Sequence, residues 1–268
     1  MEYKMIVLDL DGTLTNSQKI ITEPTKEALF DIQKKGYKVV LASGRPTHGI
    51  VHLAHELRLE EYGGYILSFN GSCITDCRTG KVVYEKVIPA EWIGQIYDKS
   101  VEYGTGIMTY EGDALISSLD PDCYIQKEAR VCRLKLKPVE DFKGYVNFTP
   151  NKCVLTGEPD HLAQVEKKMQ RHFNGLMSIY RSEPYFIEIV PQNIDKAHSL
   201  LKLLSSLGLT ADEMICCGDG YNDISMIECA GLGVAMENAQ DVVKEVADYI
   251  TKSNDEDGVL HVIKKYFK

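Results

Sequence analysis

The sequence lacks any long apolar run. No segment of its 268 residues approaches the roughly 18 residues of a membrane span, and the N-terminus lacks a signal-peptide pattern. An excess of basic residues is also missing, because 39 Asp and Glu outnumber 30 Lys and Arg and give a net charge of −9. Nucleic-acid-binding proteins usually carry a basic face. We therefore expect a cytoplasmic protein with neither a nucleic acid nor a membrane as its partner.

The cysteines show no pairing pattern, and there is no internal repeat or low-complexity linker. The eight cysteines occur singly or within apolar runs, in a chain without a secretory signal. Cys73 and Cys77 lack the second cysteine pair or the nearby histidines of a zinc site. We expect all eight thiols to be reduced. None of the seven histidines is needed for the chemistry inferred below.

What the sequence does contain is the composition of a globular protein, with 44% apolar and 26% charged residues. Its length suits two modest domains or one large one. Strand and helix patterns alternate near both ends of the chain, which is typical of a parallel α/β sheet. The expected strands are 5–8, 37–42, 65–69, 214–217 and 233–236, and the expected helices are 22–35, 46–63, 195–207, 224–229 and 239–247.

The alternation stops at about residue 72. A hairpin is expected over 74–84, followed by a mixture of helices and short strands that continues to about residue 190. The clearest segments are helices over 89–103 and 161–173 and strands over 106–110, 114–117, 152–156, 176–181 and 185–190. Residues 120–146 show no clear pattern. This stretch therefore reads as an α+β insertion of about a hundred residues, large enough for a small domain.

Two acidic residues follow the first buried strand. Asp9 and Asp11 are two positions apart, so on an extended chain their side chains point the same way, and Gly12 then begins a turn. Solvated turn acids are the simplest interpretation of this short string on its own. Two carboxylates that face one spot would instead require a cation between them.

Polar residues also follow two other expected strands. Ser43 comes after the second strand, and a group near the C-terminus comes after the strand over 214–217, namely Asp219, Asn222 and Asp223. Ligands of open parallel sheets bind outside the carboxyl ends of the strands, so these residues should meet Asp9 and Asp11 there. Four carboxylates without a soft ligand favour Mg²⁺.

These motifs resemble those of the haloacid dehalogenase-like hydrolases. The matching residues occur in order as Asp9-Leu10-Asp11-Gly12-Thr13, Ser43-Gly44-Arg45, Lys196 and Gly218-Asp219-Gly220-Tyr221-Asn222-Asp223. Asp195 departs from the family pattern, because relatives often have a small residue before the lysine. The position of the insertion resembles the C2-type cap of the Cof-type sugar phosphatases. The resemblance implies a Rossmann-like parallel-sheet core over 1–83 and 189–268, with an inserted α+β cap domain over 84–188.

The resemblance also implies a mechanism. Asp9 would be the nucleophile that forms an aspartyl phosphate, and Asp11 would be the general acid and base. Mg²⁺ would be held by Asp9, by the backbone carbonyl of Asp11 and by Asp219, with support from Asp223. The phosphoryl oxygens would be bound by a further set, Ser43, Gly44, Lys196 and Asn222.

The expected function is Mg²⁺-dependent hydrolysis of a small phosphorylated metabolite, with a sugar phosphate as the preferred substrate class. Arg45, Arg181 and Glu188 are candidates for substrate specificity, the last two because they lie near the end of the cap. Two alternatives stay open, a phosphomutase of the phosphomannomutase kind and a non-catalytic protein that binds a phosphometabolite. The sequence indicates neither the individual substrate nor the oligomeric state.

Overall fold

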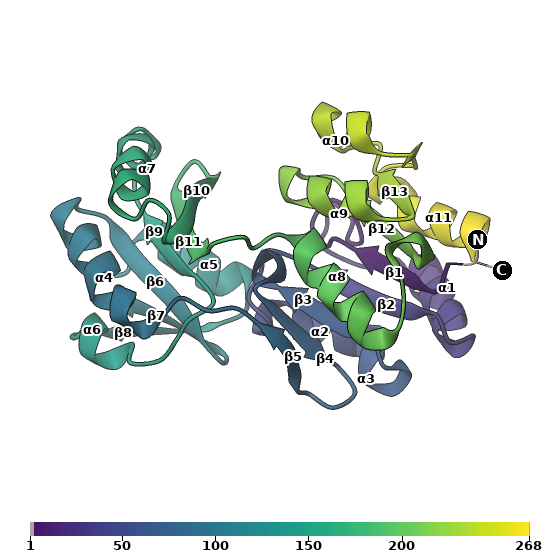
Figure 1. The fold of residues 1–268 in the computed structure, drawn as a ribbon, viewed down its shortest axis with the longest axis horizontal. Helices are drawn as coiled ribbons and strands as arrows, with labels where there is room; N and C mark the ends of the chain where they lie inside the picture. Colours follow the sequence, from purple (N-terminus) through teal and green to yellow (C-terminus); the bar gives the residue numbers. More distant parts are fainter. Residues whose placement is uncertain (1–2, 268) are drawn as a thin grey trace. The chain divides into compact units, whose positions relative to one another are not determined.

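A computed structural model describes residues 3–267 and divides them into two compact units (Figure 1). The core unit runs to Tyr84 and resumes at Asp195, whereas the inserted unit is Glu85–Ile194. None of the helices in the described range has the length and apolarity that crossing a membrane would require. All eight cysteines are free thiols, as expected from the sequence.

The core unit is built on an eight-stranded sheet with β1 (Met5–Leu8) near its middle. Strand β1 pairs in parallel with β2 (Lys38–Ala42) on one side and with β12 (Met214–Gly218) on the other. Parallel pairing continues outward to β3, β13 and β14, whereas β4 is antiparallel to β3. The remaining strands are β3 (Tyr65–Ser68), β4 (Cys73–Asp76), β5 (Val82–Glu85), β13 (Leu232–Ala235) and β14 (Tyr249–Ile250).

Alternate residues of β1 face opposite sides of the sheet, and each side packs into its own apolar core. Ile6 and Leu8 join one cluster with α1, α2 and α11, while Met5 and Val7 join another with α8. Because both faces are covered, all four residues of β1 are fully buried. The helices of the core unit are α1 (Glu23–Lys34), α2 (His48–Glu56), α3 (Leu59–Tyr62), α8 (Lys196–Leu207), α9 (Ile224–Cys229), α10 (Asp241–Val246) and α11 (Gly258–Tyr266).

The inserted unit has a six-stranded sheet of its own, in the order β10-β11-β9-β6-β7-β8. An apolar cluster that includes Ile107, Leu155 and Ile187 packs one face against α4 and α7. The strands are β6 (Gly106–Glu111), β7 (Ala114–Ser118), β8 (Lys135–Val139), β9 (Cys153–Thr156), β10 (Met177–Glu183) and β11 (Phe186–Pro191). The helices are α4 (Ile93–Glu102), α5 (Cys123–Val131), α6 (Phe142–Tyr145) and α7 (Pro159–His172).

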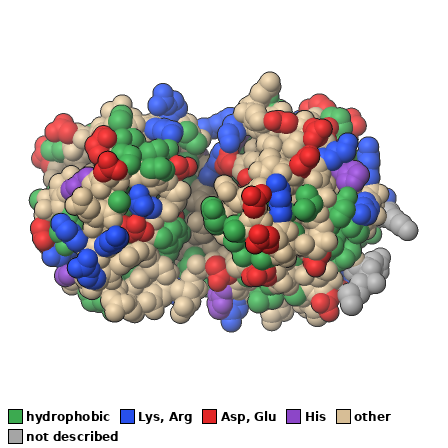
Figure 2. Space-filling view, turned by 90° about the horizontal axis from the view of Figure 1, so that it is seen from above, with side chains coloured by type: hydrophobic (Ala, Val, Ile, Leu, Met, Phe, Trp, Pro, Cys, Tyr) green, Lys and Arg blue, Asp and Glu red, His purple; other side chains and the backbone are tan. Residues whose placement is uncertain are grey.

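The structure also contains short 3₁₀ turns, at Phe69–Gly71, Ala90–Trp92, Ala211–Glu213, Tyr221–Asp223 and Asn254–Glu256. On the face shown in Figure 2, Lys and Arg side chains are interspersed with Asp and Glu.

The predicted α/β fold with an inserted α+β unit is confirmed, but the end of the inserted unit and one helix differ from the prediction. The expected end of the insertion at residue 188 would cut β11, whose Ile189 pairs with Cys153 of β9 and whose Val190 pairs with Ser178 of β10. The unit therefore extends to Ile194. The single helix expected over 46–63 is two helices, because Arg58 adopts a left-handed conformation with φ 52° and interrupts the helix.

Candidate functional site

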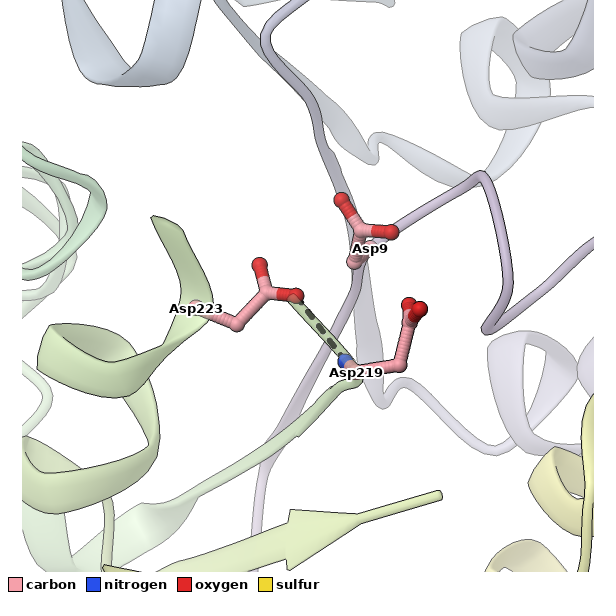
Figure 3. A group of neighbouring side chains, drawn as sticks. All are labelled: Asp9, Asp219 and Asp223. Carbon is pink, nitrogen blue, oxygen red and sulfur yellow. Dashed lines mark hydrogen bonds between the residues drawn. The ribbon is translucent and has the colours of Figure 1, made fainter. Parts of the chain in front are cut away.

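Three carboxylates converge where β1 and β12 end. Asp9 directly follows β1, while Asp219 and Asp223 come from the loop and the 3₁₀ turn after β12. One oxygen from each carboxylate lies within 4.8 Å of the others, and Figure 3 shows the three side chains grouped together, with Asp223 directed at the backbone nitrogen of Asp219. Carboxylate oxygens at this spacing can hold a hard divalent cation.

A buried lysine lies against this carboxylate cluster. Lys196 is fully buried, and its Nζ donates to Asp9 Oδ1 at 2.7 Å, to Asp223 Oδ1 at 2.6 Å and to the carbonyl of Ala42 at 2.9 Å. It is the first residue of α8, and Asp195 caps that helix by accepting from the N–H of His198 at 2.8 Å. The acid that departs from the family pattern therefore fixes the helix end that carries the lysine.

The charges of this group favour a further cation. When ionised, the three carboxylates and one ammonium carry a net charge of two negative. Burial raises the pKa of Asp9 to about 8, with the Asp223 carboxylate adding to the shift and Lys196 opposing it. Burial likewise raises the pKa of Asp219 to about 6, against the hydrogen bond that Thr13 Oγ1 donates at 2.8 Å. A divalent cation would offset the repulsion that these shifts reflect.

Asp223 is engaged chiefly with the protein itself. Its Oδ2 accepts from the backbone N–H groups of Asp219 and Gly220, each at 2.9 Å, while its Oδ1 accepts from Lys196. Gly218 allows this approach, because a Cβ there would lie 2.5 Å from the Cβ of Asp223. Asp223 therefore orients the loop that presents Asp219, and Asp9 and Asp219 remain as the carboxylates best suited to a metal ion.

The carboxylate of Asp11 is not part of the acidic group found among the described residues. Arg45 donates two hydrogen bonds to this carboxylate, from Nε to Oδ2 at 2.8 Å and from Nη2 to Oδ1 at 2.6 Å. Lys19 Nζ donates a third, to Oδ1 at 2.8 Å. Burial alone would raise the pKa of Asp11, but the two cations together lower it below its ordinary value. Arg45, predicted as a specificity residue, is thus paired with Asp11.

The other predicted phosphate ligands lie on adjoining loops. Ser43 is buried, and its Oγ accepts from the N–H of Arg45 at 3.2 Å. The amide of Asn222 donates to Asn70 Oδ1 at 3.0 Å, and a Cβ on Gly44 would lie 3.1 Å from that same oxygen. The loops after β2, β3 and β12 therefore come together through Gly44, Asn70 and Asn222.

The two specificity candidates of the inserted unit are engaged in ion pairs within it. Arg181 Nε donates to Glu166 Oε2 at 3.0 Å. Glu188 is buried and accepts from Lys152 Nζ at 3.0 Å and from the hydroxyl of Tyr180 at 3.2 Å. Their role in specificity stays a prediction.

Three residues of this region had no role predicted from the sequence, although Thr13 belongs to the first of the motifs. Thr13 supports Asp219, Lys19 pairs with Asp11, and Asn70 bonds to Asn222. Thr13 and Asn70 each carry a detectable signal, since both are polar residues just after a buried strand. Lys19 carries no such signal, because its contact depends on the path of the loop.

Comparisons with known proteins cover nearly the whole chain. Residues 6–263 match the family model for a haloacid dehalogenase-like hydrolase. The putative phosphatase YxeH of Bacillus subtilis (strain 168) is 32% identical, with 97% of each chain covered. A haloacid dehalogenase-like hydrolase from Bacteroides thetaiotaomicron superposes with a TM-score of 0.96 and 47% identity, over 99% of this chain and all of its own. The subclass IIB sugar phosphatase BT4131 gives a TM-score of 0.82 and 26% identity, over 98% of both chains.

Proposed function

Because the chain belongs to the haloacid dehalogenase-like hydrolases, as a phosphatase of the Cof type, we propose that it hydrolyses a sugar phosphate through an aspartyl phosphate at Asp9. The observation that carries this proposal is the group of three carboxylates beside the buried Lys196, with Asp9 directly at the end of the central strand. The sugar-phosphate class is supported by the likeness to the sugar phosphatase BT4131.

Magnesium fits the donor set. Asp9 and Asp219 would hold the ion, with the backbone carbonyl of Asp11 as a further oxygen ligand and Asp223 fixing the loop. The arrangement is all-oxygen and carries the negative charge that a hard divalent cation requires. When bound, Mg²⁺ offsets charge on the phosphoryl group and lets a carboxylate approach a dianion.

The reaction has two displacements at phosphorus. In the first, an Asp9 oxygen forms a bond to phosphorus while the bond to the sugar oxygen breaks, and that oxygen takes a proton from Asp11. In the second, a water molecule gives its proton to Asp11 and attacks phosphorus, so that Asp9 is released and inorganic phosphate forms. Ser43 would donate to the phosphoryl oxygens as negative charge develops, and Lys196 would do so by releasing one of its three hydrogen bonds.

A substrate screen tests this function. The intact protein is assayed with Mg²⁺ against phosphorylated sugars, nucleotides and vitamin precursors, and the substrates are ranked by kcat/KM. We expect release of inorganic phosphate, loss of activity in EDTA and recovery when Mg²⁺ is restored. Full turnover in metal-free buffer would contradict the metal assignment. Formation of an isomeric sugar phosphate instead of free phosphate would favour a mutase.

A further inference from the structure

The turn after β3 has an unusual backbone. Phe69, Asn70 and Gly71 are consecutive and all have positive φ, at 51°, 55° and 101°. Glycine accepts this region freely and asparagine tolerates it, but a bulky aromatic residue there is a genuine outlier. Such conformations persist only where the surroundings hold them, and they often occur at functional sites.

Contacts from two directions hold this turn. On one side, the N–H of Phe69 donates to the carbonyl of Arg45 and the N–H of Asn70 donates to the carbonyl of Ser43, each at 3.0 Å. On the other side, the carbonyl of Gly71 accepts from the hydroxyl of Ser199 in α8. The turn therefore joins the loop of the predicted phosphate ligand Ser43 to the helix that begins with Lys196.

The side chain of Asn70 makes a third connection. Its Oδ1 accepts from the amide of Asn222 at 3.0 Å, and its carboxamide packs directly against the backbone of Gly44. This carboxamide thus lies between the loop after β2 and the turn after β12. Its placement depends on the left-handed backbone of the turn, which aims the side chain at both.

We propose that Asn70 is a positioning residue of the phosphate site. Its carboxamide holds the Asn222 amide and supports the Ser43–Arg45 loop in the arrangement that binds phosphoryl oxygens. This inference rests on the proposed function, because that function assigns the phosphate contacts to Ser43, Gly44 and Asn222. It adds a residue that contributes through its neighbours, and it explains why an aromatic residue and an asparagine are kept in a conformation that favours glycine.

The test compares Asn70→Gly, Asn222→Ala and the double variant with the wild-type protein. Glycine accepts the left-handed backbone of the turn and removes the side chain that carries the carboxamide. The matched control is Asp120→Gly, since Asp120 is exposed and also left-handed, with φ 58°. Binding of inorganic phosphate in the presence of Mg²⁺ is measured by calorimetry, and KM and kcat are measured with p-nitrophenyl phosphate.

We expect Asn70→Gly to weaken phosphate binding about tenfold, the size of one lost hydrogen bond to a charged group, and to raise KM more than it lowers kcat. Asn222→Ala should give at least a similar loss, and the double variant should lose less than the product of the two single losses, because the contact between Asn70 and Asn222 is removed in both single variants. Asp120→Gly should behave as wild type.

Wild-type affinity in Asn70→Gly, or losses that multiply in the double variant, would overturn the proposal. If Asn70→Gly does not fold, Asn70→Ala replaces it in the same cycle, since alanine also lacks an acceptor for Asn222. A wild-type protein that binds phosphate with Mg²⁺ but turns over no ester would refute the proposed function while leaving Asn70 testable by binding. A wild-type protein that does neither would refute both.

Discussion

Asp9 and Asp11 lie two residues apart and have opposite electrostatic surroundings. Burial and neighbouring carboxylates raise the pKa of Asp9, whereas Arg45 and Lys19 lower the pKa of Asp11. Without a bound cation, these directions are the reverse of what the two roles require, because a nucleophile acts in its ionised form and a general acid in its protonated form. A cation held by Asp9 would favour the ionised form of that carboxylate. Asp11 is ionised and held by two cations, so proton donation by Asp11 requires that this ion pair open and that the carboxylate first take up a proton from solvent.

The raised pKa values of two carboxylates predict how the stability of the protein depends on pH and on the metal ion. Asp9 and Asp219 have folded-state pKa values of about 8 and about 6, above their usual 3.8. Between these ordinary and raised values, the folded protein binds more protons than the unfolded chain. Their contribution to stability should therefore fall as pH rises from about 4 to about 8. Because Mg²⁺ binds the ionised carboxylates, its stabilising effect should be larger at high pH.

Thermal unfolding with EDTA or with Mg²⁺, at about pH 6 and about pH 8.5, measures this effect. We expect Mg²⁺ to raise Tm more at the higher pH, and Asp219→Asn to lose most of that gain. The same Mg²⁺ gain at both pH values, or a gain that survives in Asp219→Asn, would mean that these carboxylates do not hold the metal.

At this scale the sequence could place side chains at strand ends but could not orient them. The convergence of Asp9, Asp219 and Asp223 follows from strand ends in a parallel sheet. Lys196 was identified only through the family resemblance, because an isolated lysine is ordinarily a surface residue. The pairing of Asp11 with Arg45 depends on the path of the loop and on which rotamer each side chain adopts, and neither is encoded in a local pattern.

At the scale of elements, the close approach of the Asp223 side chain to the backbone of Gly218 positions the acidic loop after β12. Gly218 ends this strand, and a Cβ there would lie within 2.7 Å of three atoms of the Asp223 side chain. Asp223 in turn holds two backbone N–H groups and Lys196. A single methyl group at position 218 would therefore disturb the whole cluster.

Gly218→Ala should destabilise the protein by about 1–3 kcal/mol, as overpacking usually does, and should sharply lower kcat. The matched control is Gly94→Ala in α4, where a Cβ would meet nothing within 4 Å. That change should stabilise the protein by about 0.5–1 kcal/mol and leave kcat unchanged. Urea unfolding and turnover of p-nitrophenyl phosphate provide both measurements, and a Gly218→Ala protein with wild-type stability and kcat would refute the assignment.

Elements with strong periodicity could be predicted, and weakly patterned ones could not. Helices α1, α7 and α8 lie within a residue or two of their predicted ranges. The unclear stretch over 120–146 contains α5, β8 and α6, all short. Strand β8 lies at the edge of its sheet and contains Pro138, so it lacks both the apolar pattern and the composition of a central strand.

At the scale of the whole molecule, the chain combines a core that carries the carboxylates with an inserted unit that has a sheet and an apolar core of its own. The loss of strand and helix alternation near residue 72 indicated this insertion. Its end was missed by six residues, because β11 continues through Val190 and Pro191 without any change in composition.

We propose that the inserted unit selects the substrate, as caps do by closing over a site and excluding water. In the test variant, residues 85–194 are deleted and a short glycine linker joins the two parts of the core. This variant should keep hydrolysis of p-nitrophenyl phosphate and lose discrimination among sugar phosphates. The informative quantity is kcat/KM for the best sugar phosphate divided by that for p-nitrophenyl phosphate. If a folded variant, checked by circular dichroism, retains the ratio of the intact protein, the inserted unit does not select the substrate.

Asp9 is proposed to carry the phosphoryl group covalently, and trapping the phosphoenzyme tests this role most directly. Asp11→Asn and Asp9→Asn proteins are mixed with p-nitrophenyl phosphate and Mg²⁺, quenched in acid and analysed by mass spectrometry of the intact chain and its peptides. Asp11→Asn should accumulate one hydroxylamine-sensitive phosphoryl group on Asp9. The p-nitrophenolate leaving group needs little protonation, so Asp9 is still phosphorylated, whereas hydrolysis of the phosphoenzyme lacks its general base. Asp9→Asn should carry none and should not turn over. A phosphoryl group on another residue, or turnover by Asp9→Asn, would contradict the account.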